Sequence, residues 1–294
     1  MNYANLYANF LKKFIKPKRP LKVVLDCSNG TTGPVLEQLF AVEQNCKTLL
    51  LNKNPDGNFP AHGPNPLAEG AMAELGREVV KNKADFGAVF DADGDRVFFV
   101  DDRGRRLDPT AATLILAKRF KGSLALPMNI GPFLRKELAA AGHEVADSRV
   151  GHYFLKKLMK EKKLGFAAEQ SGHYYFKNFF NLDSGIFAAV EFINAVSELS
   201  GPLSKWVDAI APRWISEETN FNVADKAAAL EKLKSTYAPA AEKISELDGL
   251  SVWLGSWWFN VRASNTENLL RLNLEADSEA LFLEKFQEVK EILE

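Results

Sequence analysis

Cysteines and long apolar runs are scarce in this 294-residue chain. Its two cysteines, Cys27 and Cys46, are too few for the disulfide framework of a small secreted domain. No stretch approaches the roughly 18 consecutive apolar residues of a membrane span, and residues 1–20 lack the long apolar core of a signal peptide. We therefore expect a cytoplasmic protein that does not cross a membrane.

A surplus of positive charge is also missing. The chain has 37 Lys and Arg against 38 Asp and Glu, a formal net charge of −1. General nucleic-acid binders carry a basic excess, so we do not expect nucleic acid as a partner. Apolar residues make up 46% of the chain, which is enough for several buried cores in two or three domains.

Strand and helix signals alternate along the first two thirds of the chain. This alternation predicts parallel strands with helices on the faces of the sheet. The predicted strands are residues 21–30, 47–52, 86–90, 123–128, 143–147 and 164–170. The predicted helices are residues 34–44, 67–83, 110–120, 132–142, 151–163 and 184–199.

The last third of the chain has a different pattern. Residues 211–222 predict a linker, followed by a helix at 225–247, strands at 251–261 and 269–275, and a closing helix from Ser278. The expected fold class is therefore α/β, with two consecutive α/β domains whose sheets are mixed or mainly parallel, and then a smaller α+β domain with an antiparallel sheet. The expected boundaries are residues 1–101, 102–212 and 213–294.

Three aspartates, Asp91, Asp93 and Asp95, alternate along the segment FDADGDRVFFV between two apolar runs. An acidic turn is the simplest interpretation, because Asp and Gly are turn formers. Three carboxylates on one side of the backbone repel one another, however, unless a cation compensates them. Oxygen ligands on a short loop suit Mg²⁺, which commonly pairs carboxylates with substrate phosphate oxygens.

Arg96 follows the three aspartates directly. It excludes an EF-hand, which needs Gly at that position and helices on both sides. A surface ion pair is the simplest role for this arginine and contributes little to stability. If the aspartates hold a metal, the guanidinium could instead face the phosphate that the metal contacts.

A second polar cluster, RASNTEN, occupies residues 262–268. Ser264 and Glu267 have the S-x-x-E spacing of a helix capping box. The two-residue alternation of LLRLNLEA that follows predicts a strand instead, with leucines on one face and Arg271, Asn273 and Glu275 on the other. A donor-rich loop before a strand favours an anion-binding site.

A third cluster, AAEQSGHYYF, places Glu169, Ser171 and His173 at alternate positions. An extended backbone would present all three on one face of a strand. This mixture of donors and acceptors suits the recognition of a compound with several hydroxyl groups, although exposed polar residues at a strand end are common.

The three clusters together resemble the α-D-phosphohexomutases, the phosphomannomutase/phosphoglucomutase group. DADGDR, EQSGH and RASNTEN occur in the order and at the separations of that family. LDCSNGTTGP and NPDGNFPAHGPNP also resemble segments of its second domain. The resemblance covers nearly the whole chain and implies an isomerase that moves a phosphoryl group between the 1- and 6-positions of a mannose or glucose phosphate.

The resemblance also implies residue roles. Asp91, Asp93 and Asp95 would hold Mg²⁺, and Arg96 matches the arginine beside the metal loop. Glu169, Ser171 and His173 match the loop that reads sugar hydroxyls. His152 matches a histidine upstream of the sugar loop, although a polar residue at a helix N-terminus is an equal alternative. The residues that match the loop binding the remote phosphate are Arg262, Ser264, Asn265 and Thr266.

One family feature is missing from these 294 residues. Family members begin with another α/β domain that carries the phosphorylated serine in a Ser-His-Asn-Pro segment, and no such segment occurs here. We expect this chain alone to be inactive unless a separate serine-bearing domain or chain supplies the phosphoryl group. Two alternatives stay open: a non-catalytic sugar-phosphate-binding protein and a metal-dependent sugar phosphatase.

Overall fold

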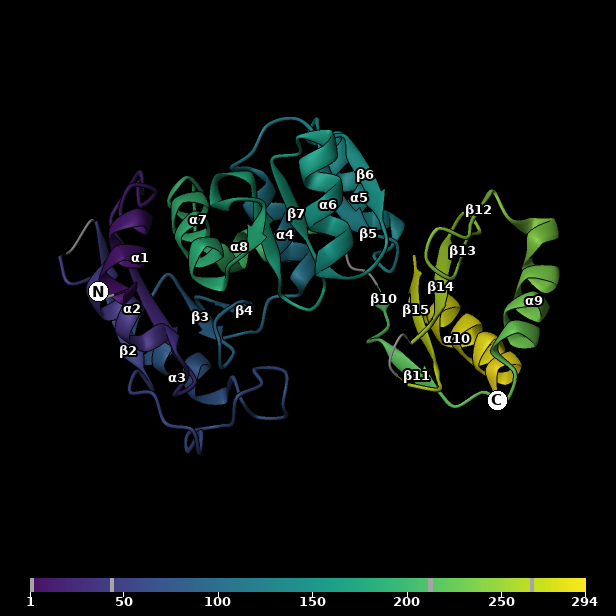
Figure 1. Ribbon diagram of the computed structural model, residues 1–294, viewed down its shortest axis with the longest axis horizontal. Coiled ribbons are helices and arrows are strands. Elements are labelled where there is room, and N and C mark those ends of the chain that lie inside the picture. Colours follow the sequence, from purple (N-terminus) through teal and green to yellow (C-terminus); the bar gives the residue numbers. More distant parts are fainter. Residues whose placement is uncertain (1–2, 43–44, 211–213, 265–266) are drawn as a thin grey trace. The chain divides into compact units, whose positions relative to one another are not determined.

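The computed structural model describes residues 3–42, 45–210, 214–264 and 267–294 (Figure 1). The chain forms two compact units, Met1–Ser123 with Lys163–Ile210, and Leu124–Lys162 with Ala211–Glu294. The division into three domains at residues 101 and 212 stays a prediction.

A mixed four-stranded sheet forms the centre of the first unit, in the order β2-β1-β3-β4. Three of its strands are parallel, and β4 runs antiparallel to β3 at one edge. The strands are β1 (Leu21–Asp26), β2 (Cys46–Leu51), β3 (Phe86–Phe90) and β4 (Val97–Asp101).

The strands β3 and β4 are buried throughout, because helices cover both faces of the sheet. Helix α3 (Ala73–Asn82) packs on one face, where Leu75 and Val79 join a cluster that includes Val89 and Val100. On the other face, Phe192 of α7 (Gly185–Ser197) stacks on Phe99 with ring centroids 3.8 Å apart. The apolar strand residues therefore fix the sheet between these two helices.

Among its described residues, the first unit also contains five further helices, one of them a 3-10 helix, and three short strands. Strands β7, β8 and β9 pair antiparallel in sequence order. The elements are α1 (Tyr3–Leu11), α2 (Thr32–Leu39), α4 (Pro109–Ala117), β7 (Phe166–Ala168), β8 (Tyr174–Phe176), η1 (Lys177–Phe179), β9 (Leu182–Asp183) and α8 (Leu203–Asp208).

The second unit contains a parallel strand pair with two helices. Pro132 at the start of α5 suits the first turn of a helix, because proline lacks only a donor that this turn leaves unused. The elements are β5 (Leu124–Pro127), α5 (Pro132–Ala140), β6 (Val145–Ser148) and α6 (His152–Lys162), with β5 parallel to β6.

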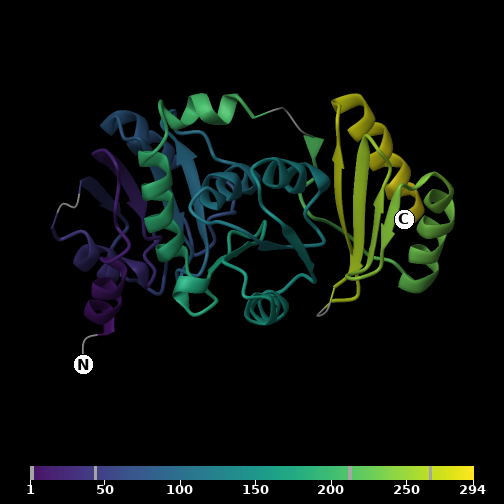
Figure 2. The ribbon, with the colours of Figure 1, turned by 90° about the horizontal axis from the view of Figure 1, so that it is seen from above.

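The C-terminal part of the second unit is an antiparallel sheet. Helices α9 and α10 cover its apolar face (Figure 2), and Leu270, Leu272 and Leu274 contribute to the core between them. The elements are β10 (Trp214–Ile215), β11 (Thr219–Phe221), α9 (Lys226–Tyr237), η2 (Ala238–Ala240), β12 (Lys243–Ser245), β13 (Leu250–Trp253), β14 (Trp257–Ala263), β15 (Leu270–Ala276) and α10 (Glu279–Leu293).

The predicted fold class is confirmed, and several element predictions are corrected. The helix predicted at 67–83 begins only at Ala73. The strand predicted at 251–261 is a hairpin of β13 and β14, because Gly255 adopts a positive φ of 71° and the chain turns there. The helix predicted at 225–247 ends at Tyr237 and is followed by a strand.

The linker prediction for residues 211–222 is wrong in its described part. Strands β10 and β11 both pair with β15 and extend the C-terminal sheet. The sequence did not predict these strands, because strands of two and three residues are too short to show alternation of apolar and polar residues. In the described part of the chain, the helices are all too short or too polar to cross a membrane.

Candidate functional site

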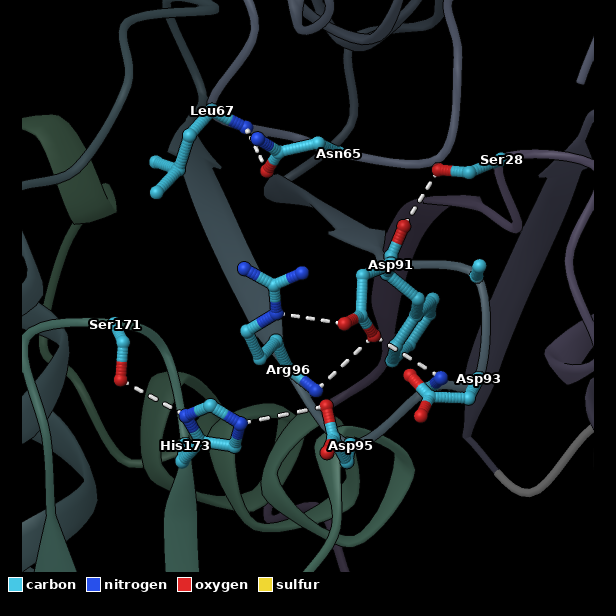
Figure 3. A network of polar contacts seen from close by, with 12 residues as sticks. Ser28, Asn65, Leu67, Asp91, Asp93, Asp95, Arg96, Ser171 and His173 are labelled. Carbon is cyan, nitrogen blue, oxygen red and sulfur yellow. Dashed lines mark hydrogen bonds and ion pairs between the residues drawn. The ribbon is translucent and has the colours of Figure 1, made fainter. Parts of the chain in front are cut away.

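The three aspartates lie in the tight loop that joins β3 to β4. Because β4 pairs antiparallel with β3, the loop has to reverse direction within residues 91–96, and Gly94 adopts a positive φ of 79° there. Asp91, Asp93 and Asp95 each offer a carboxylate oxygen, and these oxygens lie within 4.8 Å of one another (Figure 3). The three carboxylates therefore converge in this loop, as the sequence predicted.

Two distant segments hold the backbone of this loop. The N–H group of Thr31 donates to the Ala92 carbonyl at 2.8 Å, and that of Gly185 donates to the Gly94 carbonyl at 2.9 Å. A Cβ atom on Gly185 would lie 2.7 Å from the Arg96 carbonyl oxygen, so only glycine permits this approach. The start of α7 therefore defines the shape of the aspartate loop.

Asp91 is the buried member of the aspartate group, with 3% of its surface exposed. Its Oδ1 accepts from the N–H groups of Gly94 and Arg96, and its Oδ2 accepts from Arg96 Nε at 2.6 Å. Burial raises the pKa of the Asp91 carboxyl even though Arg96 acts in the opposite direction. The terminal guanidinium nitrogens of Arg96 point away from Asp91 (Figure 3).

Asp95 lies beside a histidine from the third polar cluster. His173 Nε2 is 3.4 Å from Asp95 Oδ1, and the hydrogen bond lowers the pKa of Asp95. Burial disfavours the charged form of the His173 imidazole and so lowers its pKa. Asp95 and other nearby carboxylates raise that pKa, and the net shift is upward. When protonated, His173 offsets part of the negative charge of the loop.

Glu169, Ser171 and His173 lie in the turn between β7 and β8, so the prediction of one extended strand face is wrong. The turn closes through the Glu169 N–H group, which donates to the His173 carbonyl at 2.9 Å. It still gathers the three side chains: Ser171 Oγ and His173 Nδ1 are 2.8 Å apart, and His173 Nδ1 lies 3.7 Å from Glu169 Oε2. Tyr175 donates to Glu169 at 2.5 Å.

The donor set of the loop fits a hard divalent cation. Asp91, Asp93 and Asp95 offer only oxygen ligands, range from buried to exposed, and have oxygens close enough to share one ion. Asp183 was not singled out in the sequence, yet its carboxylate lies in a second possible group with Asp95 and His173. The loop chemistry therefore favours Mg²⁺ at the aspartate group.

Arg262 lies near the end of β14 in the C-terminal sheet, and only 7% of its surface is exposed. Its register partner on β15 is Arg271, so the two side chains share the polar face of the sheet. Glu218 bridges them: its Oε2 is 2.9 Å from Arg262 Nη2 and its Oε1 is 2.9 Å from Arg271 Nη1. Sequence reasoning placed Arg271 on this face but gave it no role, and it missed Glu218 inside the supposed linker.

The remaining predicted phosphate-loop residues are described only in part. Ser264 Oγ accepts from the Glu267 N–H group at 3.2 Å, a contact of the capping-box type that forms here in a loop, before a strand rather than a helix. Asn265 and Thr266 lie outside the described residues. His152 is the first residue of α6 in the second unit, and its side chain is exposed.

Three models of one family match consecutive parts of this chain. Residues 2–104 match the phosphoglucomutase/phosphomannomutase alpha/beta/alpha domain II, residues 110–214 match domain III, and residues 218–292 match the C-terminal domain. The aspartate loop lies in the first matched range and the Glu169 turn in the second. Arg262 and Ser264 lie in the third.

Curated relatives and a solved structure agree with these matches. A phosphomannomutase of Methanocaldococcus jannaschii is 36% identical over 98% of this chain and 65% of its own length. Phosphohexose mutases of Xanthomonas campestris are 33% identical over 94% of the chain and 63% of their own length. This chain thus spans slightly less than two thirds of these relatives.

A phosphoglucomutase/phosphomannomutase family protein of Burkholderia thailandensis is 25% identical in its solved structure, with a TM-score of 0.86. The match covers 97% of this chain and 63% of that one. Sequence and fold agree, and the chain belongs to the phosphoglucomutase/phosphomannomutase family, whose domains II, III and IV it matches.

Proposed function

We propose that this chain provides the metal-, sugar- and phosphate-binding parts of a phosphohexomutase that moves a phosphoryl group between the 1- and 6-positions of mannose or glucose phosphate. The observation that carries this proposal is the convergence of Asp91, Asp93 and Asp95 beside Arg96 at the end of a buried strand. Relatives named phosphomannomutase and phosphohexose mutase support it.

Asp91, Asp93 and Asp95 would hold Mg²⁺. A bound Mg²⁺ ion would neutralise charge on the oxygens of the transferring phosphoryl group. Arg96 keeps Asp91 in place through Nε and leaves its terminal nitrogens directed away from that carboxylate, available for an anionic substrate (Figure 3). Arg96 would therefore contribute positive charge at the reacting phosphoryl group.

The turn of Glu169, Ser171 and His173 would recognise the sugar. The turn brings a carboxylate acceptor, a hydroxyl and an imidazole within a few ångströms of one another. Sugar hydroxyls both donate and accept hydrogen bonds, so a mixed set of this kind can read their orientation. Because His173 also contacts Asp95, the sugar turn and the metal loop share one neighbourhood of the first unit.

Arg262 and Ser264 would bind the phosphate that does not react, together with Asn265 and Thr266 of the same motif. Arg262 is buried at the end of a strand, where a planar guanidinium can present a fixed fork to an oxyanion. His152, which precedes the sugar turn in the sequence, would act as a catalytic residue. Its motif position alone supports this role.

The phosphoryl donor in this family is a phosphoserine, and the 294 residues contain no Ser-His-Asn-Pro segment. We therefore propose that these residues alone do not interconvert hexose 1- and 6-phosphates, and that a serine-bearing domain has to be supplied. The polypeptide regions of the relatives that lie outside the match are the natural source of such a domain.

The test is a conversion assay of glucose and mannose 1-phosphate with Mg²⁺. The chain is assayed alone and after mixing with the phosphorylated, unmatched portion of the Methanocaldococcus jannaschii relative. We expect conversion only in the mixture, and its loss in Asp93→Asn. Release of inorganic phosphate by the chain alone would identify a phosphatase instead, and binding without turnover in every mixture would identify a non-catalytic binder.

A further inference from the structure

One carboxylate bridges two arginines on the polar face of the C-terminal sheet. Glu218 uses a different oxygen for each guanidinium, and both N···O distances are 2.9 Å. Asn273 Nδ2 lies 3.4 Å from the same Oε2 that contacts Arg262. An oxyanion bound between Arg262 and Arg271 would use the positions that the two Glu218 oxygens now occupy.

An irregularity in the sheet brings Glu218 to this position. Residue 215 of β10 and residue 219 of β11 pair with residues 275 and 272 of β15, so the three residues between β10 and β11 stand opposite two residues of β15. An extra residue of this kind is a β-bulge, which bends the strand and changes the direction of a side chain. The backbone on both sides stays paired, whereas the Glu218 side chain projects over the arginines.

Burial indicates which partner can move. The Arg262 side chain is 9% exposed, and its Nε is buried with no hydrogen-bond partner among the described residues. The Glu218 side chain is 29% exposed. A buried guanidinium cannot readily leave for another partner, whereas a partly exposed carboxylate can turn towards water at lower cost. Of Arg262 and Glu218, the carboxylate is therefore the partner that can be replaced.

We propose that Glu218 is an internal substitute for the bound phosphate: it neutralises Arg262 and Arg271 while the site lacks an anion, and an incoming phosphate group displaces it. Its displacement leaves both guanidiniums to the phosphate, including that of Arg271, which lies outside the R-x-S-N-T motif. This inference rests on the proposed function only in taking the phosphate to belong to a hexose phosphate.

The local charges support displacement rather than addition. Arg271 also contacts Glu267, with Nη2 and Oε2 3.2 Å apart, so two guanidiniums already face two carboxylates. A phosphate dianion added to this neutral group would bring negative charge that no remaining cation of the group compensates. Burial opposes the ionisation of Glu218, but the two arginines hold its pKa below the ordinary value, so the carboxylate is charged at neutral pH.

The test is calorimetric titration of the 294-residue chain with inorganic phosphate at pH 7, without substrate or turnover. Glu218→Gln keeps the side-chain size and removes the competing charge, so we expect phosphate to bind about fivefold more tightly or better, the size of a modest coupling between neighbouring charges. Glu217→Gln is the matched control, because Glu217 is the exposed neighbour on the same bulge. It should leave the affinity unchanged.

Two more variants separate competition from support of the fold. Arg271→Gln should weaken phosphate binding, and Glu218→Gln should give less tightening in an Arg262→Gln background, because one of the two competed guanidiniums is then absent. If a folded Glu218→Gln variant binds phosphate as tightly as the wild type, more weakly or not detectably, the inference is overturned. Glu218 would then either have no effect on phosphate binding or hold the arginines in position. A failure of mutase turnover would leave this result unaffected.

Discussion

The aspartate loop and the arginine pair are opposite in charge and differ in how the backbone presents them. The aspartates are collected by an irregular loop that Thr31 and Gly185 hold from distant parts of the chain. Arg262 and Arg271 are register partners on two regular neighbouring strands. In both places a side chain of the chain itself lies against the charged group: His173, which can carry a positive charge, beside Asp95, and Glu218 between the arginines.

This difference predicts different sensitivities. The geometry of the aspartate loop depends on close backbone contacts with other segments, so it should be lost when those segments change. The geometry of the arginine pair follows from strand alternation and register, so changes outside its own side chains should matter less. The following substitutions test this contrast, from the largest expected effect to the smallest.

Gly185→Ala should have the largest effect, because its Cβ would lie 2.7 Å from the Arg96 carbonyl oxygen and 2.9 Å from that of Gly94. Backbone atoms cannot yield as a flexible side chain can, so we expect destabilisation of about 3 kcal/mol. Denaturant unfolding measures it. Gly201→Ala is the control, since no other group lies within 4 Å of the position that its new methyl group would take. Equal stability of the two variants would contradict the close-contact account.

Arg262→Ala should weaken hexose-phosphate binding by about 2 kcal/mol, the contribution of a charged hydrogen bond. Arg262→Lys should restore only part of the affinity, because lysine lacks the planar fork. Calorimetry with mannose 6-phosphate measures the change. Arg77→Ala removes the same charge from an exposed helix position and serves as control. Wild-type affinity in Arg262→Ala would remove Arg262 from the phosphate site.

Asp93→Asn should abolish stabilisation by Mg²⁺ and leave the metal-free protein nearly unchanged, because Asp93 is exposed. A ligand at ten times its Kd stabilises the folded state by about 1.4 kcal/mol. Thermal melting with and without Mg²⁺ measures it. Asp91→Asn is the contrast: it should lower the Tm even without metal, since Asp91 is buried and accepts from Arg96. A full Mg²⁺ response in Asp93→Asn would exclude this aspartate as a ligand.

The smallest effect concerns a buried pair outside both sites. His62 Nε2 lies 3.1 Å from the fully buried Asp26, and this hydrogen bond raises the pKa of His62 despite partial burial. The pair therefore stabilises the fold fully below the unfolded-state pKa of histidine, and this stabilisation is lost as pH rises through the folded-state pKa.

We expect a loss on the order of 1 kcal/mol across that range, the typical net contribution of a hydrogen bond. Unfolding free energies measured from about pH 6 to about pH 9, a range that starts just below the ordinary histidine pKa, provide the check. Asp26→Asn should flatten the pH profile. A profile that is already flat in the wild type would show that folding does not raise the pKa of His62.

The sequence predicted strand β15 and both of its faces, because leucines alternate with polar residues across residues 270–276. It also predicted the convergence of the three aspartates, because they alternate between two apolar runs. It placed Glu169, Ser171 and His173 on a strand, where the structure has a turn, since alternation over five residues cannot distinguish a strand from a tight reversal. The functional roles of these residues stay predictions.

The spacing of residues along the sequence determined much of the structure by itself: the residues that face the core, the strands and helices that form, and the polar side chains that collect at strand ends. The tertiary structure decided the rest: that Gly185 shapes a loop far earlier in the chain, and that Glu218 lies between Arg262 and Arg271. Such contacts depend on the pairing of segments far apart in the sequence, and the stability of a short strand depends on its neighbours more than on its own residues. No local pattern encodes that pairing, so only the folded chain reveals it.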